Sequence, residues 1–135
     1  MKKIRNYSAI TAHGDVPARK MVLDLMDRVL QEVDSYQRIR DVMHVEGNVL
    51  HVGVKSWNLE SKRNIYLLGA GKACNAMAQA VCDVLGERIT KGIICVKIKE
   101  EQDHYCNTDV YVGGHPLPNE EGMLAAQKMI DLILQ

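Results

Sequence analysis

The sequence contains no phenylalanine, and aromatic residues of any kind make up only 4% of its 135 residues. A core must therefore be built from aliphatic side chains, which fits an apolar content of 47%. A single compact domain of this length can bury roughly two-thirds of the surface that its unfolded chain exposes. The 25% of charged residues is usual for folded proteins and argues against disorder. We therefore predict that residues 1–135 form one folded domain.

The sequence also lacks a net charge, because 17 basic residues balance 17 acidic ones. Without an excess of positive charge, no overall field attracts DNA, RNA or an anionic membrane. The longest uninterrupted apolar runs, Ile65–Leu68 and Ile93–Val96, are far shorter than the ~20 residues that cross a bilayer. We therefore predict neither a nucleic-acid partner nor a membrane partner.

A secretory signal is also missing, since the basic start at Lys2, Lys3 and Arg5 is followed by polar residues and not by an apolar stretch. The four cysteines form no C-x-x-C pair and no other metal-ligand spacing. Cysteines of this kind are typical of small buried side chains in a reducing compartment. We predict a cytoplasmic protein and assign no metal ligand.

Apolar periodicity predicts a first helix from about residue 16 to about residue 34. Asp15 can cap this helix and Pro17 suits its first turn. Its apolar residues recur at three- and four-residue steps and are expected to face the core: Met21, Val22, Leu25, Met26, Val29, Leu30 and Val33. A shorter helix over residues 35–43 and a strand or hairpin arm over residues 48–54 are predicted to follow.

The second half of the chain alternates short apolar runs with helical periodicity. Strands are predicted over residues 65–68, 93–96 and 110–112, and a polar loop over residues 97–108. Helices are predicted over residues 74–85, ended by Gly86, and from residue 120 onward, capped by Asn119. Four residues of the last helix are expected to point inward: Met123, Ala126, Ile130 and Ile133.

Strands that are apolar on both faces and alternate with helices are typical of a parallel sheet covered by helices. The predicted fold class is α/β, a Rossmann-like, small and mostly parallel sheet flanked by helices. Three or four strands are few for such a fold, and the pattern therefore predicts an incomplete domain.

The first candidate binding segment is a glycine-rich turn, Gly69-Ala70-Gly71-Lys72-Ala73, between a predicted strand and a predicted helix. Glycines let backbone amides approach an anion, a helix N-terminus adds partial positive charge, and Lys72 can add a full charge. The spacing is not that of a Walker A loop. It is not a clean dinucleotide fingerprint either, because Cys74 replaces the third glycine and Lys97, instead of an acid, closes the next strand. A phosphate or carboxylate site and a tight turn with an exposed lysine both stay open.

The second candidate segment is the loop Gly113-Gly114-His115-Pro116-Leu117-Pro118-Asn119, which follows a predicted strand. Ligands of open α/β sheets bind at the carboxyl ends of strands. His115 could donate a hydrogen bond to a ligand oxygen or act as a base. Alternatively, the prolines set the approach to the last helix and His115 bonds to the backbone.

Together these segments resemble the type-2 glycerate kinases (glycerate 2-kinases), and the resemblance covers nearly the whole chain. The segments most similar to the family are the run from Ile65 to Ala73 with Met77-Ala78 after it, the strand ending at Lys97, and the loop from Gly114 to Gly122. Residues 48–58 and the entry to the first helix at His13-Gly14-Asp15 fit the same family. The glycine-lysine turn and the Gly-His-Pro loop are fairly specific in combination.

The resemblance implies an enzyme that transfers the γ-phosphoryl group of ATP to the 2-hydroxyl of D-glycerate in the presence of Mg²⁺. Family members have a Rossmann-like N-terminal domain and a second domain, with the active site in the cleft between them. Lys72 matches an active-site lysine of the family, and it is the predicted catalytic residue because it would neutralise charge on glycerate or on the moving phosphoryl group. The predicted substrate- or phosphate-binding residues are Gly69, Gly71, Lys72, Gly114 and His115.

The sequence departs from the family pattern at two short segments. Ile98-Lys99-Glu100 stands where many members have a Gly-His pair, and Asn119 stands where Asp is frequent. The chain also corresponds to only the first part of the family's first domain, so the metal-holding carboxylates are expected to lie outside it. We therefore predict an N-terminal fragment of a two-domain kinase that is inactive by itself.

Two other functions remain as alternatives. Relatives of these kinases have been labelled hydroxypyruvate reductases, so an NAD(P)-dependent oxidoreductase is one; it predicts a response of Trp57 fluorescence or of stability to NADH. The other is a non-catalytic Rossmann-like binding or assembly module, whose open sheet edge could pair with another copy as a homo-oligomer. Size-exclusion chromatography distinguishes that module by a stoichiometric dimer.

Overall fold

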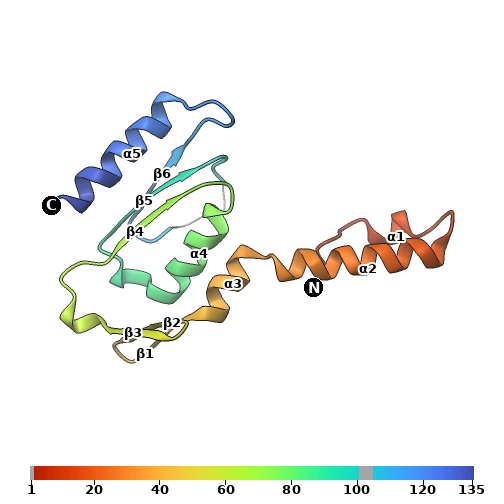
Figure 1. Ribbon diagram of the computed structural model, residues 1–135, viewed down its shortest axis with the longest axis horizontal. Helices are drawn as coiled ribbons and strands as arrows, with labels where there is room; N and C mark the ends of the chain where they lie inside the picture. Colours follow the sequence, from red (N-terminus) through yellow and green to blue (C-terminus); the bar gives the residue numbers. More distant parts are fainter. Residues whose placement is uncertain (1, 101–104) are drawn as a thin grey trace. The chain divides into compact units, whose positions relative to one another are not determined.

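A computed structural model describes residues 2–100 and 105–135, so residues 101–104 of the predicted polar loop lie outside the described residues. The chain forms two compact units, Met1–Asp34 and Ser35–Gln135, and each is described by itself (Figure 1). The assignment of residues 1–135 to one domain stays a prediction. Within the described residues, no helix combines the length and the apolar character needed to cross a membrane.

The first unit consists of two helices, α1 (Tyr7–Ile10) and α2 (Val16–Glu32). The carboxylate of Asp15 accepts a hydrogen bond from the backbone N–H of Ala18 at 3.1 Å, and a proline lies in the first turn of α2. The helix and its cap are therefore as predicted, because a short acceptor side chain satisfies an amide that has no partner inside the helix.

The N-terminal segment is hydrogen-bonded to α2 through a buried carboxylate. Asp27 is only 4% exposed. Its Oδ1 accepts hydrogen bonds from the backbone N–H groups of Lys3 at 2.7 Å and Ile4 at 3.0 Å, and its Oδ2 accepts from Gln31 Nε2 at 2.6 Å. One turn earlier, Asp24 accepts from the hydroxyl of Tyr7 at 2.8 Å.

Within the unit Met1–Asp34, the N-terminal segment does not cover the apolar face of α2. The seven residues expected to face a core are 44–75% exposed, whereas the buried residues of the helix are Leu23 and Asp27. The prediction that these seven residues point inward is therefore wrong. The physical reason is that Asp24 and Asp27 bind the N-terminal segment along a different face of the helix.

Acid should release the N-terminal segment. Hydrogen bonding from the backbone of Ile4, supported by Lys3 and Gln31, lowers the pKa of Asp27 although burial opposes this shift. A carboxyl whose pKa is lowered by folding stabilises the folded state above its unfolded pKa, and this stabilisation is lost as the pH falls through the folded value. We expect hydrogen-exchange protection of the Lys3 and Ile4 amides at neutral pH to disappear below about pH 4.

Asp27→Asn should weaken this protection at neutral pH and remove its dependence on acid, because the amide does not titrate. Asp131→Asn, on an exposed helix position of the other unit, is the matched control. Full protection of both amides at pH 2 would contradict the role given to Asp27.

The second unit is centred on a three-stranded parallel sheet of β4 (Tyr66–Ala70), β5 (Lys91–Val96) and β6 (Thr108–Val112), in the order β4-β5-β6. All three strands are predicted from the sequence, although the observed strands are longer or shifted by one or two residues. The α/β fold class with a parallel sheet is therefore confirmed.

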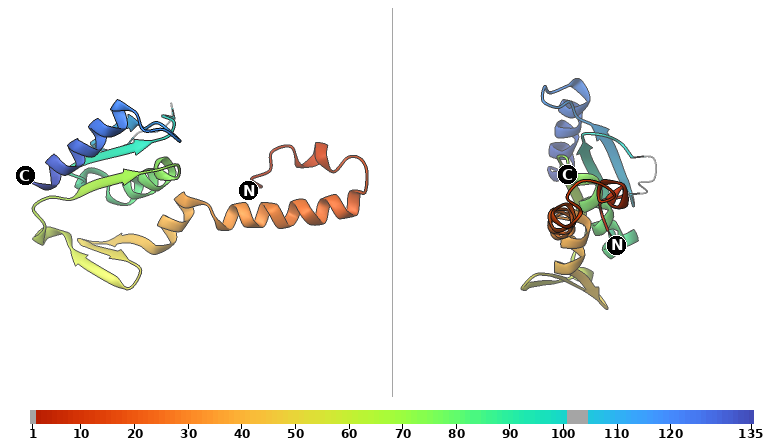
Figure 2. Two further views of the ribbon diagram at one scale, coloured as in Figure 1. Left: turned by 45° about the horizontal axis from the view of Figure 1, so that its top comes forward. Right: turned by 90° about the vertical axis from the view of Figure 1, so that its right-hand side faces the viewer.

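Helices α4 (Cys74–Leu85) and α5 (Glu120–Ile133) cover opposite faces of this sheet (Figure 2). Successive side chains of a strand point to opposite faces, and β5 shows both. Ile94 and Val96 pack with Cys74 and Ala78 of α4. Cys95 points to the other face, where its Sγ lies 3.9 Å from the position that a Cβ would occupy on Gly122 of α5.

The predicted inward face of α5 is wrong. Met123, Ile130 and Ile133 are 70%, 51% and 63% exposed, and Ala126 is exposed as well. The helix instead buries Ala125 completely. Small side chains allow a helix to approach a sheet closely, and a Cβ on Gly122 would lie 3.4 Å from the Cα of Gly113.

A second, antiparallel sheet precedes the parallel one. Helix α3 (Ser35–Val42) leads into the meander of β1 (Met43–Glu46), β2 (Val49–Val52) and β3 (Lys55–Asn58), and 3₁₀ turns cover Leu59–Ser61 and Gly86–Arg88. Only α3 and the middle strand are predicted from the sequence. The meander packs on α4, in an aliphatic core centred on four residues: Met43, Cys82, Leu85 and Ile89.

Candidate anion-binding site

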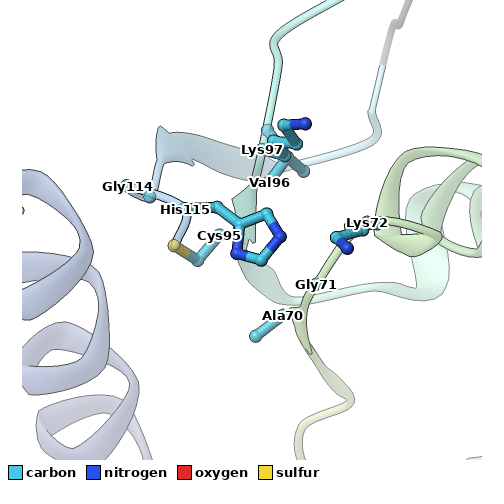
Figure 3. Close-up of a pocket in the computed structure, with 9 residues that line it drawn as sticks. Ala70, Gly71, Lys72, Cys95, Val96, Lys97, Gly114 and His115 are labelled. Atoms are coloured by element: carbon cyan, nitrogen blue, oxygen red, sulfur yellow. The ribbon is translucent and has the colours of Figure 1, made fainter. Parts of the chain in front are cut away.

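The carboxyl ends of the three parallel strands lie at one edge of the sheet, and a cavity of about 460 Å³ opens there (Figure 3). A volume of this size is in the usual range for small-molecule sites. Each strand end contributes a short run of residues to the wall, namely Ala70-Gly71-Lys72, Cys95-Val96-Lys97 and Gly113-Gly114-His115. The two predicted binding segments and the end of the central strand thus share one cavity.

Four of the five predicted site residues line this cavity: Gly71, Lys72, Gly114 and His115. Figure 3 shows the side chains of Lys72 and His115 pointing toward one another across the opening. Gly69 is placed differently, because it lies within β4 and does not contribute to this wall. A Cβ on Gly69 would lie 2.6 Å from Cys74 Sγ, so the absence of a side chain there permits the packing of α4 on the sheet.

The glycine turn contributes Ala70, Gly71 and Lys72 to the cavity wall and ends at the start of α4. Gly71 has a φ of +118°, which favours glycine, and its own N–H donates to the carbonyl of Cys95 at 3.0 Å. Ala73, the cap residue of α4, supplies no side-chain hydrogen bond. Within the described part of the chain, the N–H groups of Lys72 and Ala73 have no acceptor. Amides at a helix N-terminus without acceptors favour an anion there.

Asn119 organises the Gly-His-Pro loop through three hydrogen bonds of 2.9 Å. Its Oδ1 accepts from the N–H groups of Gly114 and Gly122, and its Nδ2 donates to the carbonyl of Val112. Because the same side chain caps α5, the loop and the helix start are fixed together. The loop has no room for a side chain at Gly114, where a Cβ would lie 2.2 Å from the carbonyl oxygen of Leu117.

The charge in the cavity wall has one sign. Lys72, Lys97 and the imidazole of His115 are its ionisable nitrogen groups, and no aspartate or glutamate of residues 2–100 and 105–135 lines it. Neither lysine forms an ion pair with another described residue. Sequence reasoning did not select Lys97 as a site residue, although its position directly after a predicted strand was a signal that could have found it.

The described residues do not form a metal centre of the usual kind. Residues 2–100 and 105–135 contain no group of three or more His, Cys, Asp or Glu side chains able to hold a metal ion. The four cysteines form no disulfide: Cys74 and Cys82 are buried, and Cys95 and Cys106 are half-buried. The chemistry that the wall favours is the binding of carboxylate or phosphate oxygens.

An open parallel sheet with a cationic cavity at its carboxyl edge defines a Rossmann-like α/β domain with a candidate anion site. The chain belongs to the family described as a domain of unknown function, DUF4147, which matches residues 21–135.

Two curated relatives are glycerate kinases. A D-glycerate 2-kinase of Thermotoga maritima is 31% identical over 71 residues, which cover 53% of this chain and 17% of that protein. A glycerate 2-kinase of Pyrococcus horikoshii is 24% identical over 115 residues, which cover 85% of this chain and 25% of that protein. The chain thus spans a quarter or less of the length of these relatives. The resemblance to the glycerate 2-kinases is confirmed.

Solved structures show the same fold. A protein of Pyrococcus horikoshii matches with a TM-score of 0.72 and 24% identity, over 87% of this chain and 26% of that one. A glycerate kinase of Thermotoga maritima matches with a TM-score of 0.61 and 20% identity, over 84% of this chain and 24% of that one.

Replacing Asn119 should loosen the loop that carries His115. Asn119→Ala removes the helix cap and three hydrogen bonds, so we expect the free energy of unfolding to fall by about 1 kcal/mol or more. Asn119→Asp keeps the acceptor but cannot donate to the carbonyl of Val112 when ionised, and it should loosen Gly113–Pro118 without removing the helix cap. Urea unfolding and hydrogen exchange of the Gly114 amide measure both effects, and an unchanged Asn119→Ala variant would contradict this arrangement.

Cys95 offers a direct readout of cavity occupancy. Burial raises the pKa of Cys74 and raises that of Cys82 to about 12, so neither thiol should react with iodoacetamide near pH 8. Cys95 lines the cavity, whereas Cys106 does not. We expect saturating inorganic phosphate to slow the alkylation of Cys95 and to leave Cys106 unaffected, as measured by peptide mass spectrometry against chloride of equal ionic strength. Equal slowing at both thiols would argue against an anion in this cavity.

Proposed function

We propose that this chain forms the substrate-anchoring part of a glycerate 2-kinase, in which the full-length enzyme transfers the γ-phosphoryl group of ATP to the 2-hydroxyl of D-glycerate. The observation that carries the proposal is that Lys72 and His115, from two separate motifs, line one cavity to which the described part of the chain contributes no acidic residue. The similarity to two curated glycerate 2-kinases supports the same reaction.

Lys72 is the proposed catalytic residue. Phosphoryl transfer depends mainly on positioning and on the stabilisation of charge that develops on the transferred group. Lys72 and Ala73 directly precede α4, so the ammonium of Lys72 and the backbone N–H groups of both residues would bind the oxygens of one phosphoryl group. His115 would hold a substrate oxygen by donating or accepting a hydrogen bond, and its position in the cavity wall supports this role.

The phosphoryl donor and the metal remain predictions. ATP would supply the phosphoryl group, and the cationic wall is suited to phosphate oxygens. Mg²⁺ prefers oxygen ligands such as carboxylates, and none of the described residues of the cavity wall carries a carboxylate. The residues described do not fit that metal by themselves, so no step is assigned to it here.

A kinase agrees with the cavity wall better than a nicotinamide-dependent reductase does. Dinucleotide-binding domains place an acidic residue after the second strand of the unit to bind the ribose hydroxyls. In this chain the residue that follows β5 and lines the cavity is Lys97. A lysine there favours an anionic ligand.

Removing the Lys72 ammonium should abolish most of the activity. In a full-length relative, alanine in place of the lysine that matches Lys72 is expected to lower kcat by about 100-fold or more, because a charge at the transferred group contributes a few kcal/mol to the transition state. A coupled assay of ADP release measures this change. Arginine at the same position should restore part of the rate.

The thermal unfolding midpoint of both variants should stay close to that of the parent enzyme, since Lys72 makes no ion pair in the described part of this chain. An alanine variant that is correctly folded and retains full kcat would refute the proposed site. The 135-residue chain without the remainder of a kinase is expected to show no turnover.

A further inference from the structure

The proposed function assigns no catalytic or binding step to Lys97, although its ammonium is the second full positive charge in the cavity wall. It follows β5, the central strand, so it lies between the strand ends that carry Lys72 and His115. Two ammonium groups in one cavity repel each other, and among the residues that the structure describes no carboxylate of the wall compensates them. A ligand with two separate anionic groups would satisfy both.

A buried hydrogen bond holds the Lys97 segment in place. Asn75, in the first turn of α4, is 9% exposed, and its Nδ2 donates to the carbonyl of Ile98 at 2.9 Å. This bond ties the residue after Lys97 to the helix turn that begins just beyond Lys72. The Oδ1 of Asn75 has no hydrogen-bond partner among the described residues. The side chain of Asn75 is therefore held only through its Nδ2 group, which donates to Ile98.

The two lysines have different surroundings. Lys72 is accompanied by two backbone N–H groups without acceptors at the start of a helix, which suits the several oxygens of a phosphoryl group. Lys97 follows the strand β5 and does not precede a helix, so no helix N-terminus adds partial positive charge beside it. A single ammonium is sufficient to pair with a carboxylate.

On the basis of the proposed function, we propose that Lys97 is the carboxylate anchor of this cavity and that Asn75 is its positioning residue. The favoured ligand class is then a short hydroxy acid that carries a carboxylate and a phosphoryl group, with the carboxylate on Lys97 and the phosphoryl group at Lys72. The singly charged hydroxy acid should bind through Lys97, and it should bind more weakly.

Three probe ligands separate the two anchors in the full 135-residue chain: glycerate, 2-phosphoglycerate and inorganic phosphate. Lys97→Gln should lower the affinity for glycerate and for 2-phosphoglycerate by about tenfold or more each. It should leave the affinity for phosphate unchanged, because only the first two ligands carry a carboxylate. Lys72→Gln should weaken phosphate and 2-phosphoglycerate. Isothermal titration or protection of Cys95 from alkylation gives each affinity.

Lys99→Gln is the matched control, since Lys99 lies two residues beyond Lys97 and does not line the cavity. Lys97→Arg should restore carboxylate binding. Asn75→Ala should reproduce the Lys97→Gln pattern, with weakened carboxylate ligands and retained phosphate binding. If Asn75 had a purely structural role, Asn75→Ala would lower the affinity for all three ligands.

The outcomes distinguish this inference from the proposed function. If Lys97→Gln binds all three ligands as Lys99→Gln does while Lys72→Gln weakens phosphate, the carboxylate anchor is refuted and the proposed function stands. If Lys97→Gln weakens phosphate as much as glycerate, Lys97 acts only through its general charge and the assignment also fails. If the unsubstituted chain binds none of the three, both proposals are overturned.

Discussion

The site depends on backbone hydrogen bonds that continue across the sheet beyond the ends of its strands. The N–H of Gly71 donates to the carbonyl of Cys95 at 3.0 Å, and the N–H of Gly113 donates to the carbonyl of Val96 at 2.8 Å. These bonds place the residues that follow, Lys72 and Gly114, at the same edge. Gly113 must be small for this, since a Cβ would lie 2.7 Å from Cys95 Sγ. The cationic cavity is therefore a consequence of how three parallel strands end, and its side chains need no ion pairs to be brought together.

The helices and parallel strands could be predicted because their signals are local. Caps at Asp15 and Asn119 satisfy amides that a helix leaves free, and these side chains are recognisable in a sequence. The last strand of the meander could not be predicted, since all residues of Lys55–Asn58 are exposed and show no alternation in burial. The first strand does alternate, with Met43 and Val45 less exposed than His44 and Glu46, and this signal was missed. Periodicity also identifies an apolar stripe on a helix without identifying what covers it. This is why the predictions of which faces of α2 and α5 point inward were wrong. Small residues such as Ala125 gave a weaker signal than the large ones that stay exposed.

The candidate site was partly predictable for a similar reason. Lys72 and His115 lie in glycine-containing turns after strands, and such turns are visible in the sequence. Gly69 looked equivalent to Gly71, but the two differ in backbone conformation and in the neighbour that a Cβ would meet. Lys97 and Asn75 were not selected, because one follows an ordinary strand and the other acts through a hydrogen bond between segments that are distant in the sequence. Contacts of that kind depend on the tertiary fold.

Asn119 shows how a departure from the family pattern can be accommodated by the local structure. Aspartate at this position would cap the helix equally well and would add favourable charge at its N-terminus. It could not donate to the carbonyl of Val112 while ionised, whereas the amide of Asn119 both donates and accepts. The carboxylate would also place a negative charge beside the Gly-His-Pro loop. Glu121 already places one carboxylate there, on the N–H of Val112 at 2.8 Å. A neutral side chain at Asn119 avoids a second negative charge next to the loop that carries His115, which favours an anionic ligand beside it.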